Sequence, residues 1–246
     1  MKLENKIVLI TGASSGIGRS TAVAFAKEGC SVLINYKTDT KSAEDVLEEC
    51  NHYSKENMLV QADITMENDI VEMFKKIKEK NSRLDVLVNN AGIFDEGDSP
   101  TNIEVFEKIY KNNFLGCIMV TKYALGLLKE GKIVNVSSIH GRLGHGSPES
   151  IAYSTFKTAL DSYTKNLAKS LAPQILVNGI APGRVATPMW DSPNEKEQIE
   201  LGQVHLIKRM IQPEEIADSI LFLAKNDAMC GEVLTIDGGM SLVTLG

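Results

Sequence analysis

The fold is decided by residues 6–18, which read KIVLITGASSGIG. The apolar run at 6–11 predicts a buried β-strand, and the apolar spacing at 17–28 has the period of a helix. A glycine cluster joins the two segments. A strand that passes through a glycine-rich turn into a helix is typical of the first unit of a parallel α/β sheet.

Three glycines shape this turn. Three residues separate Gly12 from Gly16 and one separates Gly16 from Gly18, so the spacing differs from the dinucleotide fingerprint Gly-x-Gly-x-x-Gly. The physical requirements are the same: the backbone can approach a pyrophosphate, and the helix N-terminus offers free N–H groups and positive potential. Ser14 and Ser15 can add hydroxyl donors. The pattern predicts a phosphate-binding loop, although a tight turn without a ligand would also favour glycine.

The rest of the chain repeats this alternation. Strands are expected at residues 6–11, 31–36, 57–62, 84–89, 132–137, 175–180 and 233–236. Helices are expected at residues 17–28, 41–51, 67–79, 102–129, 152–171 and 213–224. We therefore expect an α/β fold, a Rossmann-type doubly wound parallel sheet of about seven strands with helices on both faces. No linker or repeat interrupts it, so residues 1–246 are expected to form one domain.

The widest irregular region of the sequence is residues 182–206. It follows the sixth expected strand, and ligands of open α/β sheets bind outside the carboxyl ends of the strands. We expect this covering segment to close over a substrate, with Met189 and Trp190 as apolar contacts. The alternative is an exposed loop without a chemical role.

Composition narrows the function further. The formal net charge of -6 argues against a nucleic-acid partner. No apolar run is long enough to span a membrane and no secretory leader is visible at the N-terminus, so the chain is expected to be cytoplasmic. The four cysteines are widely spaced, which predicts small buried side chains and neither a disulfide framework nor a metal site.

Tyr153, Lys157 and Ser138 form a candidate catalytic group. Positions i and i+4 share one face of a helix, so the Tyr153 and Lys157 side chains can enter a common pocket. A phenol has a pKa near 10, and a neighbouring cation lowers it. Lys157 and the positive ring of a cofactor would together prepare Tyr153 for proton exchange near neutral pH, and Ser138 could donate a hydrogen bond to the same oxygen. The spacing alone also occurs by chance on helix surfaces.

The full set of motifs resembles that of the short-chain dehydrogenase/reductase family, over about residues 6–239. The matching motifs are, in chain order, residues 11–18, Asp63, residues 89–92 (NNAG), Asn113, Ser138, Tyr153 with Lys157, and Pro182-Gly183. The resemblance implies hydride transfer between a nicotinamide cofactor and a substrate, interconverting a carbonyl and a secondary alcohol. A non-catalytic, dinucleotide-binding relative is the rival class, but it should have lost Tyr153, Lys157 or Ser138.

The resemblance also implies a role for each catalytic residue. Tyr153 would be the general acid and base, Lys157 would lower its pKa and hold the nicotinamide ribose, and Ser138 would orient the substrate oxygen. Ser138 is preferred to Ser137 because Ser138-Ile-His-Gly141 matches the family pattern Ser-x-x-Gly.

Asn113 matches the asparagine that bends its helix in this family and holds a water in the proton relay. Gly116, three residues later, supports this alignment. The competing assignment is Asn112.

The cofactor would contact residues from several loops. Asp63 would accept a hydrogen bond from the adenine, residues 89–92 would pack against the cofactor, Pro182-Gly183 would touch the nicotinamide edge, and Thr187 would bind its carboxamide. The whole expected set is Gly12, Ser14, Ser15, Gly16, Ile17, Gly18, Tyr36, Lys37, Asp63, Ile64, Asn90, Ala91, Gly92, Tyr153, Lys157, Pro182, Gly183 and Thr187. Without the resemblance, Asp63 and Pro182-Gly183 would be read as ordinary turn residues.

Cofactor choice depends on the end of the second strand. An acidic residue there favours NAD, whereas a cation attracts the 2'-phosphate of NADP. The family's acidic position is occupied by Tyr36, and Lys37 follows it. NADP(H) is therefore favoured and NAD(H) remains possible. Ser15 and Arg19 could reinforce this preference, although Arg19 could instead form an ion pair on the helix surface.

The substrate is less well defined. The general resemblance is to 3-oxoacyl-acyl-carrier-protein reductases, with sugar or polyol dehydrogenases as the alternative. Because the carrier protein is acidic, Arg184, Lys208 and Arg209 are candidates for a basic patch beside the cleft. Residues 142–151 form a loop about two residues longer than in related sequences, which makes substrate transfer from any relative uncertain.

The histidines of this region and the subunit count complete the expectations. We interpret His140 and His145 as surface loop residues rather than substrate contacts. The family is mostly tetrameric, so a homotetramer is expected, with the apolar residues 240–245 suited to an interface.

Overall fold

The centre of the protein is one parallel sheet. The structure is a computed structural model that describes residues 1–142, 146–190 and 194–242. Seven strands lie in the order β3-β2-β1-β4-β5-β6-β7, and every neighbouring pair is parallel. The strands are β1 (Ile7–Ile10), β2 (Ser31–Tyr36), β3 (Met58–Gln61), β4 (Val86–Asn89), β5 (Gly131–Val136), β6 (Ile175–Pro182) and β7 (Val233–Ile236). The expected doubly wound sheet of seven strands is confirmed.

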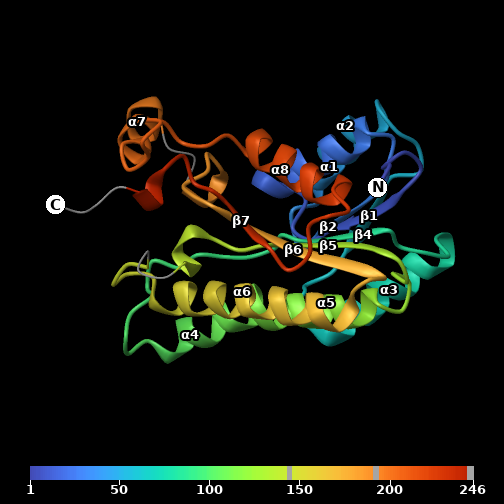
Figure 1. The fold of residues 1–246 in the computed structure, drawn as a ribbon, viewed down its shortest axis with the longest axis horizontal. Coiled ribbons are helices and arrows are strands. Elements are labelled where there is room, and N and C mark those ends of the chain that lie inside the picture. Colours follow the sequence, from blue (N-terminus) through green and yellow to red (C-terminus); the bar gives the residue numbers. More distant parts are fainter. Residues whose placement is uncertain (143–145, 191–193, 243–246) are drawn as a thin grey trace.

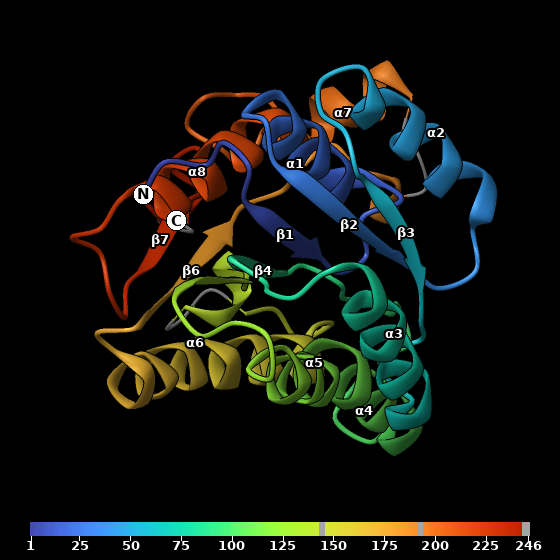
Figure 2. The same ribbon diagram turned by 90° about the vertical axis from the view of Figure 1, so that its right-hand side faces the viewer.

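Helices cover both faces of the sheet. They are α1 (Gly16–Lys27), α2 (Thr40–Asn51), α3 (Glu67–Lys80), α4 (Ile103–Tyr110), α5 (Gly116–Ala124), α6 (Ile151–Leu171), α7 (Glu195–Gly202) and α8 (Pro213–Lys225). Helices α1, α2 and α8 lie on one face, and α3, α4, α5 and α6 lie on the other (Figures 1 and 2). This three-layer arrangement buries the sheet on both sides, as its continuous apolar strands require.

Strand β1 shows how the layers are held together. Val8 and Ile10 pack into the core beneath α1 and α8, while Leu9 packs into the core beneath α3 and α5. The alternation follows from the two-residue period of a strand. All three side chains are fully buried.

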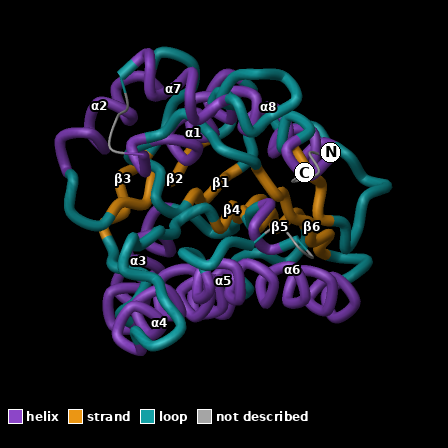
Figure 3. Tube along the Cα trace, turned by 90° about the vertical axis from the view of Figure 1, so that its left-hand side faces the viewer, coloured by secondary structure: helices purple, strands orange, loops and turns teal. Residues whose placement is uncertain are grey.

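The strand order reverses its direction of growth between β1 and β4. The chain moves outward from β1 to β3, returns to β4 on the other side of β1, and continues outward to β7 (Figure 3). A ligand site is expected outside the carboxyl ends of the strands at such a switch point. The loops after β1 and β4 therefore border the site described below.

Two regions differ from the sequence-based prediction. The single helix expected at 102–129 is divided by one π-helical turn, Lys111–Leu115, and ends at Ala124. Gly126 lies directly beyond this end, and glycine is a poor helix former. The region 182–206 was predicted to be irregular, but it contains a 3₁₀ turn, Pro188–Trp190, and the helix α7.

Helix α7 has a local cause. The Asn194 side chain accepts the Glu197 N–H at 3.1 Å, and the Glu197 carboxylate accepts the Asn194 N–H at 2.9 Å. This reciprocal capping box starts a helix even where the apolar pattern is weak.

Candidate active site

A cavity of about 460 Å³ opens at the carboxyl end of the sheet. Loops after six strands and one face of α6 line it, and its size is that of a small-molecule site. It brings together these expected residues: Gly12, Ser14, Ser15, Gly16, Ile17, Lys37, Asp63, Ile64, Asn90, Ala91, Gly92, Ser138, Tyr153, Lys157, Pro182, Gly183 and Thr187. Gly18, Tyr36 and Asn113 are not among the lining residues and lie behind its wall.

The glycine loop has the backbone that the sequence predicts. Gly12 and Gly16 have φ values of 61° and 52°, which disfavour any residue with a side chain. A Cβ atom at Gly18 would lie 2.2 Å from the Gly12 oxygen and 2.6 Å from Asn90 Nδ2. Helix α1 begins at Gly16, its Ser15 side chain forms no cap hydrogen bond, and its first turn has no acidic residue. The helix N-terminus is therefore available to an anion.

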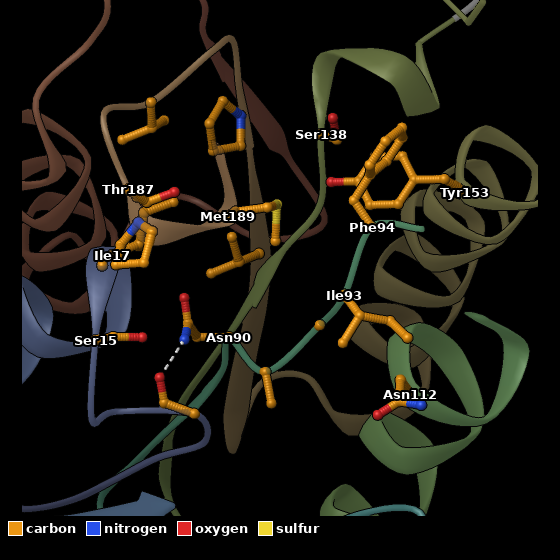
Figure 4. A pocket seen from close by; sticks show the side chains of 18 of the residues that line it. Ser15, Ile17, Asn90, Ile93, Phe94, Asn112, Ser138, Tyr153, Thr187 and Met189 are labelled. Carbon is orange, nitrogen blue, oxygen red and sulfur yellow. Dashed lines mark hydrogen bonds between the residues drawn. The ribbon is translucent and has the colours of Figure 1, made fainter. Parts of the chain in front are cut away.

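The loops after β1 and β4 are bonded to one another. The Thr11 hydroxyl accepts the N–H groups of Asn90 and Ala91 at 2.9 and 3.0 Å. The Asn90 side chain donates to the carbonyls of Thr11 and Gly12 at 2.9 and 3.0 Å. Figure 4 shows Asn90 facing Ser15 and Ile17 across the cavity floor. These bonds fix the glycine loop to the centre of the sheet.

Lys37 and Asp63 form an ion pair at the other end of the cavity. Lys37 Nζ lies 2.8 Å from Asp63 Oδ2, and Asp63 Oδ1 accepts the Thr65 N–H and hydroxyl. Burial alone would raise the pKa of Asp63, but the hydrogen bonds from Lys37 and Thr65 lower it overall. Asp63 is thus held ionised, and Lys37 is held beside it.

Tyr36 and Arg19, two residues considered for cofactor binding, do not line the cavity. The Tyr36 side chain is buried outside the cavity. Arg19 pairs with Glu49 at 3.0 Å on the helix surface, which was the alternative considered for it. The cavity wall beside Lys37 is formed by Asn35, Thr38 and Asp39.

Helix α6 presents both Tyr153 and Lys157 to the cavity. The helix begins at Ile151, and its own Ser150 makes no cap bond to the first turn. Instead, Asp98, from the loop after β4, accepts the N–H groups of Ala152 and Tyr153, each at 3.0 Å. Asp98 is buried and lies 55 residues from Tyr153 in the chain. This carboxylate sets where the helix that carries Tyr153 begins.

Ser138 lies directly opposite Tyr153. Ser138 follows β5 and Tyr153 extends from α6, and their hydroxyls point toward the same region, with Phe94 beside the phenol ring (Figure 4). The Phe94 and Tyr153 rings are 5.5 Å apart in an edge-to-face contact. Ser137 also lines the cavity, but its hydroxyl donates to the Lys157 carbonyl at 3.2 Å. The geometry agrees with the choice of Ser138 over Ser137.

The Ser-x-x-Gly pattern has a packing reason. A Cβ atom at Gly141 would lie 2.8 Å from the Lys157 carbonyl carbon. The turn that carries Ser138 can therefore lie against α6 only because residue 141 is glycine. Thr158 donates to the Gly141 carbonyl at 2.9 Å and holds this contact.

Burial dominates the electrostatics of the pair on α6. Burial raises the pKa of the Tyr153 phenol, and the hydrogen bond with Ser138 opposes that rise. Burial also lowers the pKa of Lys157 to about 8. Lys157 Nζ donates to the Val136 carbonyl at 2.8 Å and lies 5.6 Å from the centre of the Tyr153 ring. In the protein alone, burial outweighs the hydrogen bond from Ser138 and raises the Tyr153 pKa. The prediction that Lys157 and a bound cofactor together lower this pKa stays a prediction.

Asn113 is buried in the π-helical turn, where its side-chain amide binds the backbone of Ile93. Its Oδ1 accepts the Ile93 N–H and its Nδ2 donates to the Ile93 carbonyl, both at 2.8 Å. A Cβ atom at Gly92 would lie 3.3 Å from Asn113 Oδ1 and 3.6 Å from Lys157 Nζ. Asn113 and Lys157 therefore flank Gly92. Asn112, the competing residue, lines the cavity and donates to the Lys108 carbonyl at 2.9 Å.

The requirement for glycine at position 116, directly after the π-helical turn, has a packing reason. A Cβ atom there would lie 2.8 Å from Ile64 Cδ1 and 2.9 Å from the Ile64 carbonyl oxygen. The helix can pass the loop after β3 only with glycine at this position.

The outer wall of the cavity contains both apolar and polar side chains. Met189 and Trp190 line it, as expected for the covering segment, and Thr187 lies against the glycine loop, 3.0 Å from a Cβ built at Gly16. His140 also lines it, with its ring 6.0 Å from that of Tyr153 and its Nδ1 3.0 Å from the Ser150 hydroxyl. The interpretation of His140 as a surface loop residue is therefore wrong. His145 and the rest of 143–145 lie outside the described residues.

Arg184 is the remaining charged residue of the wall on this side. Its backbone N–H donates to Nε2 of the fully buried His205 at 3.1 Å, and His205 Nδ1 lies 3.2 Å from the Gly202 carbonyl. The two other candidates for a basic patch are occupied elsewhere. Arg209 forms a bidentate pair with Glu215 at 2.7 Å, and Lys208 donates to the Gln203 carbonyl at 3.0 Å.

Comparison with known proteins assigns this arrangement to a family. A family described as enoyl-(acyl carrier protein) reductase matches residues 12–241. The 3-oxoacyl-[acyl-carrier-protein] reductase of Aquifex aeolicus is 37% identical, over 98% of this chain and 99% of its own. The chain belongs to the short-chain dehydrogenase/reductase family. A glucose and ribitol dehydrogenase homolog of Arabidopsis thaliana is 34% identical, over 97% of this chain and 86% of its own.

Solved structures of the short-chain dehydrogenase/reductase family agree. One from Caenorhabditis elegans, of unknown function and determined with cofactor, superimposes with a TM-score of 0.90 at 34% identity and covers 100% of this chain and 98% of that one. Membership makes this chain an NAD(P)-dependent oxidoreductase. The cavity fits such a cofactor, because Gly12 and Gly16 leave an open cradle at a helix N-terminus.

Some interactions of the site have no signal in the sequence alone. Asp98 binds the start of α6, 55 residues away in the chain, His140 binds Ser150, and the ion pair of Lys37 with Asp63 joins two different strand ends. Sequence reasoning missed Asp98, which lies in a loop without a motif. In the part of the chain that the structure describes, no helix is long and apolar enough to cross a membrane.

Proposed function

We propose that this enzyme prefers NADP(H) and interconverts a carbonyl and a secondary alcohol, with a 3-oxoacyl thioester as its substrate. The observation that carries the proposal is the convergence of Ser138, Tyr153 and Lys157 on one cavity that begins at the glycine loop. The alternative substrate class is a sugar or polyol. Its support is the likeness to the Arabidopsis homolog.

Tyr153 moves the proton in this proposal. In carbonyl reduction the phenol protonates the developing alkoxide, and in alcohol oxidation the phenolate removes the hydroxyl proton. A bound nicotinamide supplies or accepts the hydride at the substrate carbon. The Ser138 hydroxyl, which faces the phenol, donates to the substrate oxygen and holds it in place.

Lys157 and Asn113 belong to the proposed path by which Tyr153 regains its proton. Lys157 Nζ is buried, lies beside the Tyr153 ring, and has its charge stabilised by the Val136 carbonyl. Asn113 Oδ1 lies on the other side of Gly92. We propose that a water between these two groups replaces the proton that Tyr153 gives up, as in the relay of the family.

The cofactor would lie along the floor of the cavity. Residues of the glycine loop would hold its pyrophosphate, Asp63 and Ile64 its adenine, and Lys157 its nicotinamide ribose. Asn90, Ala91 and Gly92 would pack against it, and Pro182, Gly183 and Thr187 would contact the nicotinamide. These roles are supported by the common wall that the residues form.

Lys37 carries the proposed NADP preference. Its ammonium lies at the adenine end, where Asp63 already holds it, and a 2'-phosphate would be attracted to it. Lys37→Ala should raise the KM for NADPH about tenfold and leave the KM for NADH nearly unchanged. Initial rates with both cofactors at saturating substrate measure this. An unchanged preference for NADPH would refute the role of Lys37.

A substrate screen tests the reaction itself. We expect NADPH-linked reduction of acetoacetyl thioesters, and no comparable turnover of diketones, sugars or polyols in either direction. Activity on sugars or polyols alone would replace the first proposal with the second. Tyr153→Phe is the matched variant, because it removes one oxygen and keeps the ring contact with Phe94.

For Tyr153→Phe we expect unchanged cofactor binding and a loss of kcat of about a hundredfold or more. Cofactor fluorescence measures the binding and single-turnover rates measure the chemistry. A variant with nearly full kcat would show that another group moves the proton. It would also revive the reading of the chain as a dinucleotide-binding relative whose residue 153 is not catalytic.

We further propose that the enzyme works in the cytoplasm as a homotetramer. Cys30, Cys50 and Cys117 are buried free thiols, as expected, whereas the free thiol of Cys230 is exposed, contrary to the expectation. Four unpaired thiols suit a reducing compartment. Of the expected C-terminal interface, residues 243–246 lie outside the described part, and Leu242 is among the most exposed apolar side chains. The single-domain reading of residues 1–246 is kept as part of this proposal.

A further inference from the structure

Arg184 has a fixed backbone beside the cavity. It follows Pro182, the last residue of β6, and Gly183. Its backbone N–H donates to His205, and its backbone carbonyl accepts the Ile211 N–H at 3.0 Å. His205 is fully buried and also bonded to the Gly202 carbonyl, so the two ring nitrogens hold the end of α7 and Arg184 together. The direction in which the Arg184 side chain leaves the sheet is therefore set by the fold.

The guanidinium of Arg184 lies against the Trp190 ring. Its carbon is 5.4 Å from the centre of the indole ring. Among the residues that the structure describes, no hydrogen bond or ion pair reaches this guanidinium, and its Nε is buried and unbonded. Burial lowers the pKa of Arg184, yet an arginine stays charged in proteins. The half-buried Arg184 thus has one buried donor, Nε, that no described residue satisfies.

The two neighbouring cations, Arg209 and Lys208, both have polar partners among the described residues, unlike the Arg184 guanidinium. Arg209 is neutralised by the Glu215 carboxylate, and Lys208 is exposed and bonded to a carbonyl. Within residues 1–142, 146–190 and 194–242, no carboxylate forms an ion pair with Arg184. Asp237, which lies near His205, uses its oxygens to accept the N–H groups of Gly239 and Ser241. The unmet donor of Arg184 therefore calls for an anion that arrives with a ligand.

Position and chemistry together suggest what that anion is. Arg184 and Trp190 line the same cavity as Ser138 and Tyr153 and belong to the covering segment. A guanidinium stacked on an indole keeps its edge open, and that edge matches a carboxylate or a phosphate in two parallel hydrogen bonds. Resting on the function proposed above, we infer that Arg184 and Trp190 form an anion-binding subsite for the substrate. The substrate is then a carbonyl compound with a carboxylate or phosphate group.

Trp190 provides a direct test that needs no turnover. It is the one tryptophan of the chain, so the intrinsic indole fluorescence reports on this subsite alone. The enzyme saturated with NADP⁺ is titrated at constant ionic strength with acetoacetate, with inorganic phosphate and with uncharged 2,4-pentanedione. We expect a saturable change with at least one of the two anions, none with 2,4-pentanedione, and loss of the change in Arg184→Gln.

Kinetics with matched substrates identify the source of the anion. Acetoacetate, acetoacetyl-CoA and the uncharged N-acetylcysteamine thioester carry the same oxo group. Arg184→Gln should raise KM about tenfold or more for a charged substrate and leave KM for the uncharged thioester unchanged, with kcat kept. An effect on acetoacetate points to a free oxo acid, and an effect on acetoacetyl-CoA alone points to the phosphate of a thioester carrier. Arg184→Lys should recover part of the loss.

Lys208→Gln is the matched control, because it removes a nearby positive charge that does not line the cavity. It should leave all these KM values unchanged. The inference is overturned if Arg184→Gln weakens charged and uncharged substrates equally, if Lys208→Gln has the same effect, or if the variant changes only the Kd of NADP⁺. If the enzyme reduces none of the carbonyls but wild-type Trp190 still responds to the anions and Arg184→Gln does not, the subsite stands and the proposed function fails.

Discussion

Lys157 is a buried cation whose presence opposes folding. Its pKa is lowered from 10.5 to about 8, which corresponds to a cost of about 3 kcal/mol at neutral pH. Lys157→Met keeps a side chain of similar length and gives up one hydrogen bond to Val136, worth about 1 kcal/mol. We expect this variant to melt roughly 4–8 °C higher at pH 7 and to lose kcat about a hundredfold or more.

The pH dependence identifies the cause of that gain. Between the folded pKa of about 8 and the unfolded value of 10.5, the unfolded wild-type chain binds more protons at Lys157, so wild-type stability rises with pH in this window. The advantage of Lys157→Met should therefore shrink as the pH rises from 8 toward 10.5. Calorimetry at pH 7 and pH 10 measures it. An equal advantage at both values would mean that buried charge is not the reason.

The residue types of the chemistry could be read from the sequence, but their interactions could not. Tyr153, Lys157 and Ser138 follow from spacing and family resemblance. The rise of the Tyr153 pKa in the protein without cofactor could not be predicted, because desolvation depends on how tightly α6 packs against the sheet. The same holds for His140, which reaches the cavity because Ser150 holds its ring.

Asp98 determines where α6 begins, and with it the position of Tyr153. Asp98→Ala leaves two N–H groups of the first turn without their buried acceptor, which should cost about 1–2 kcal/mol of stability. Because Tyr153 itself supplies one of these N–H groups, kcat should fall about tenfold or more while the KM for the cofactor stays close to that of the wild type. Thermal unfolding and steady-state rates measure the two effects.

Glu215→Ala is the control for Asp98→Ala, because it removes a helix cap that is far from Tyr153. Glu215 belongs to the capping box of α8, accepts the Gln212 N–H at 2.8 Å, and lies on the face of the sheet opposite α6. Its loss should also cost stability but leave kcat unchanged at a temperature where the variant is folded. If both variants lose kcat in proportion to stability, Asp98 has no positioning role.

Elements whose signals are local were predictable, and elements that depend on distant contacts were not. Helix α6 and the strands followed from apolar period and length. The π-helical turn did not follow from the apolar period, although the family resemblance implied a bend at Asn113. The turn lies where Asn113 binds both backbone groups of Ile93, twenty positions away. Helix α7 was missed for another reason: its capping box is visible in Asn194 and Glu197, but no apolar stripe follows it.

At the scale of the whole molecule, the two outer layers differ in what they leave exposed. On one side, α4, the π-helical turn and α6 carry a cluster of half-buried aromatic side chains, Phe106, Tyr110, Phe114 and Phe156, with the Phe106 and Phe156 rings 4.9 Å apart. Beside it, Ile103 is 65% exposed. On the opposite side of the sheet, α8 exposes Phe222 at 48% (Figure 1). Two separate apolar surfaces on opposite sides suit two different twofold contacts.

This arrangement leads to a prediction about assembly. Two independent twofold interfaces produce a tetramer, and the loss of either one leaves a dimer. Light scattering coupled to gel filtration should give the mass of four chains for the wild type, and of two chains for Ile103→Glu and for Phe222→Glu, because a buried unpaired carboxylate opposes association. Tyr53→Glu, at a side chain 51% exposed beyond α2, is the control and should stay tetrameric. A monomeric wild type, or variants that keep four chains, would show that these faces are not interfaces.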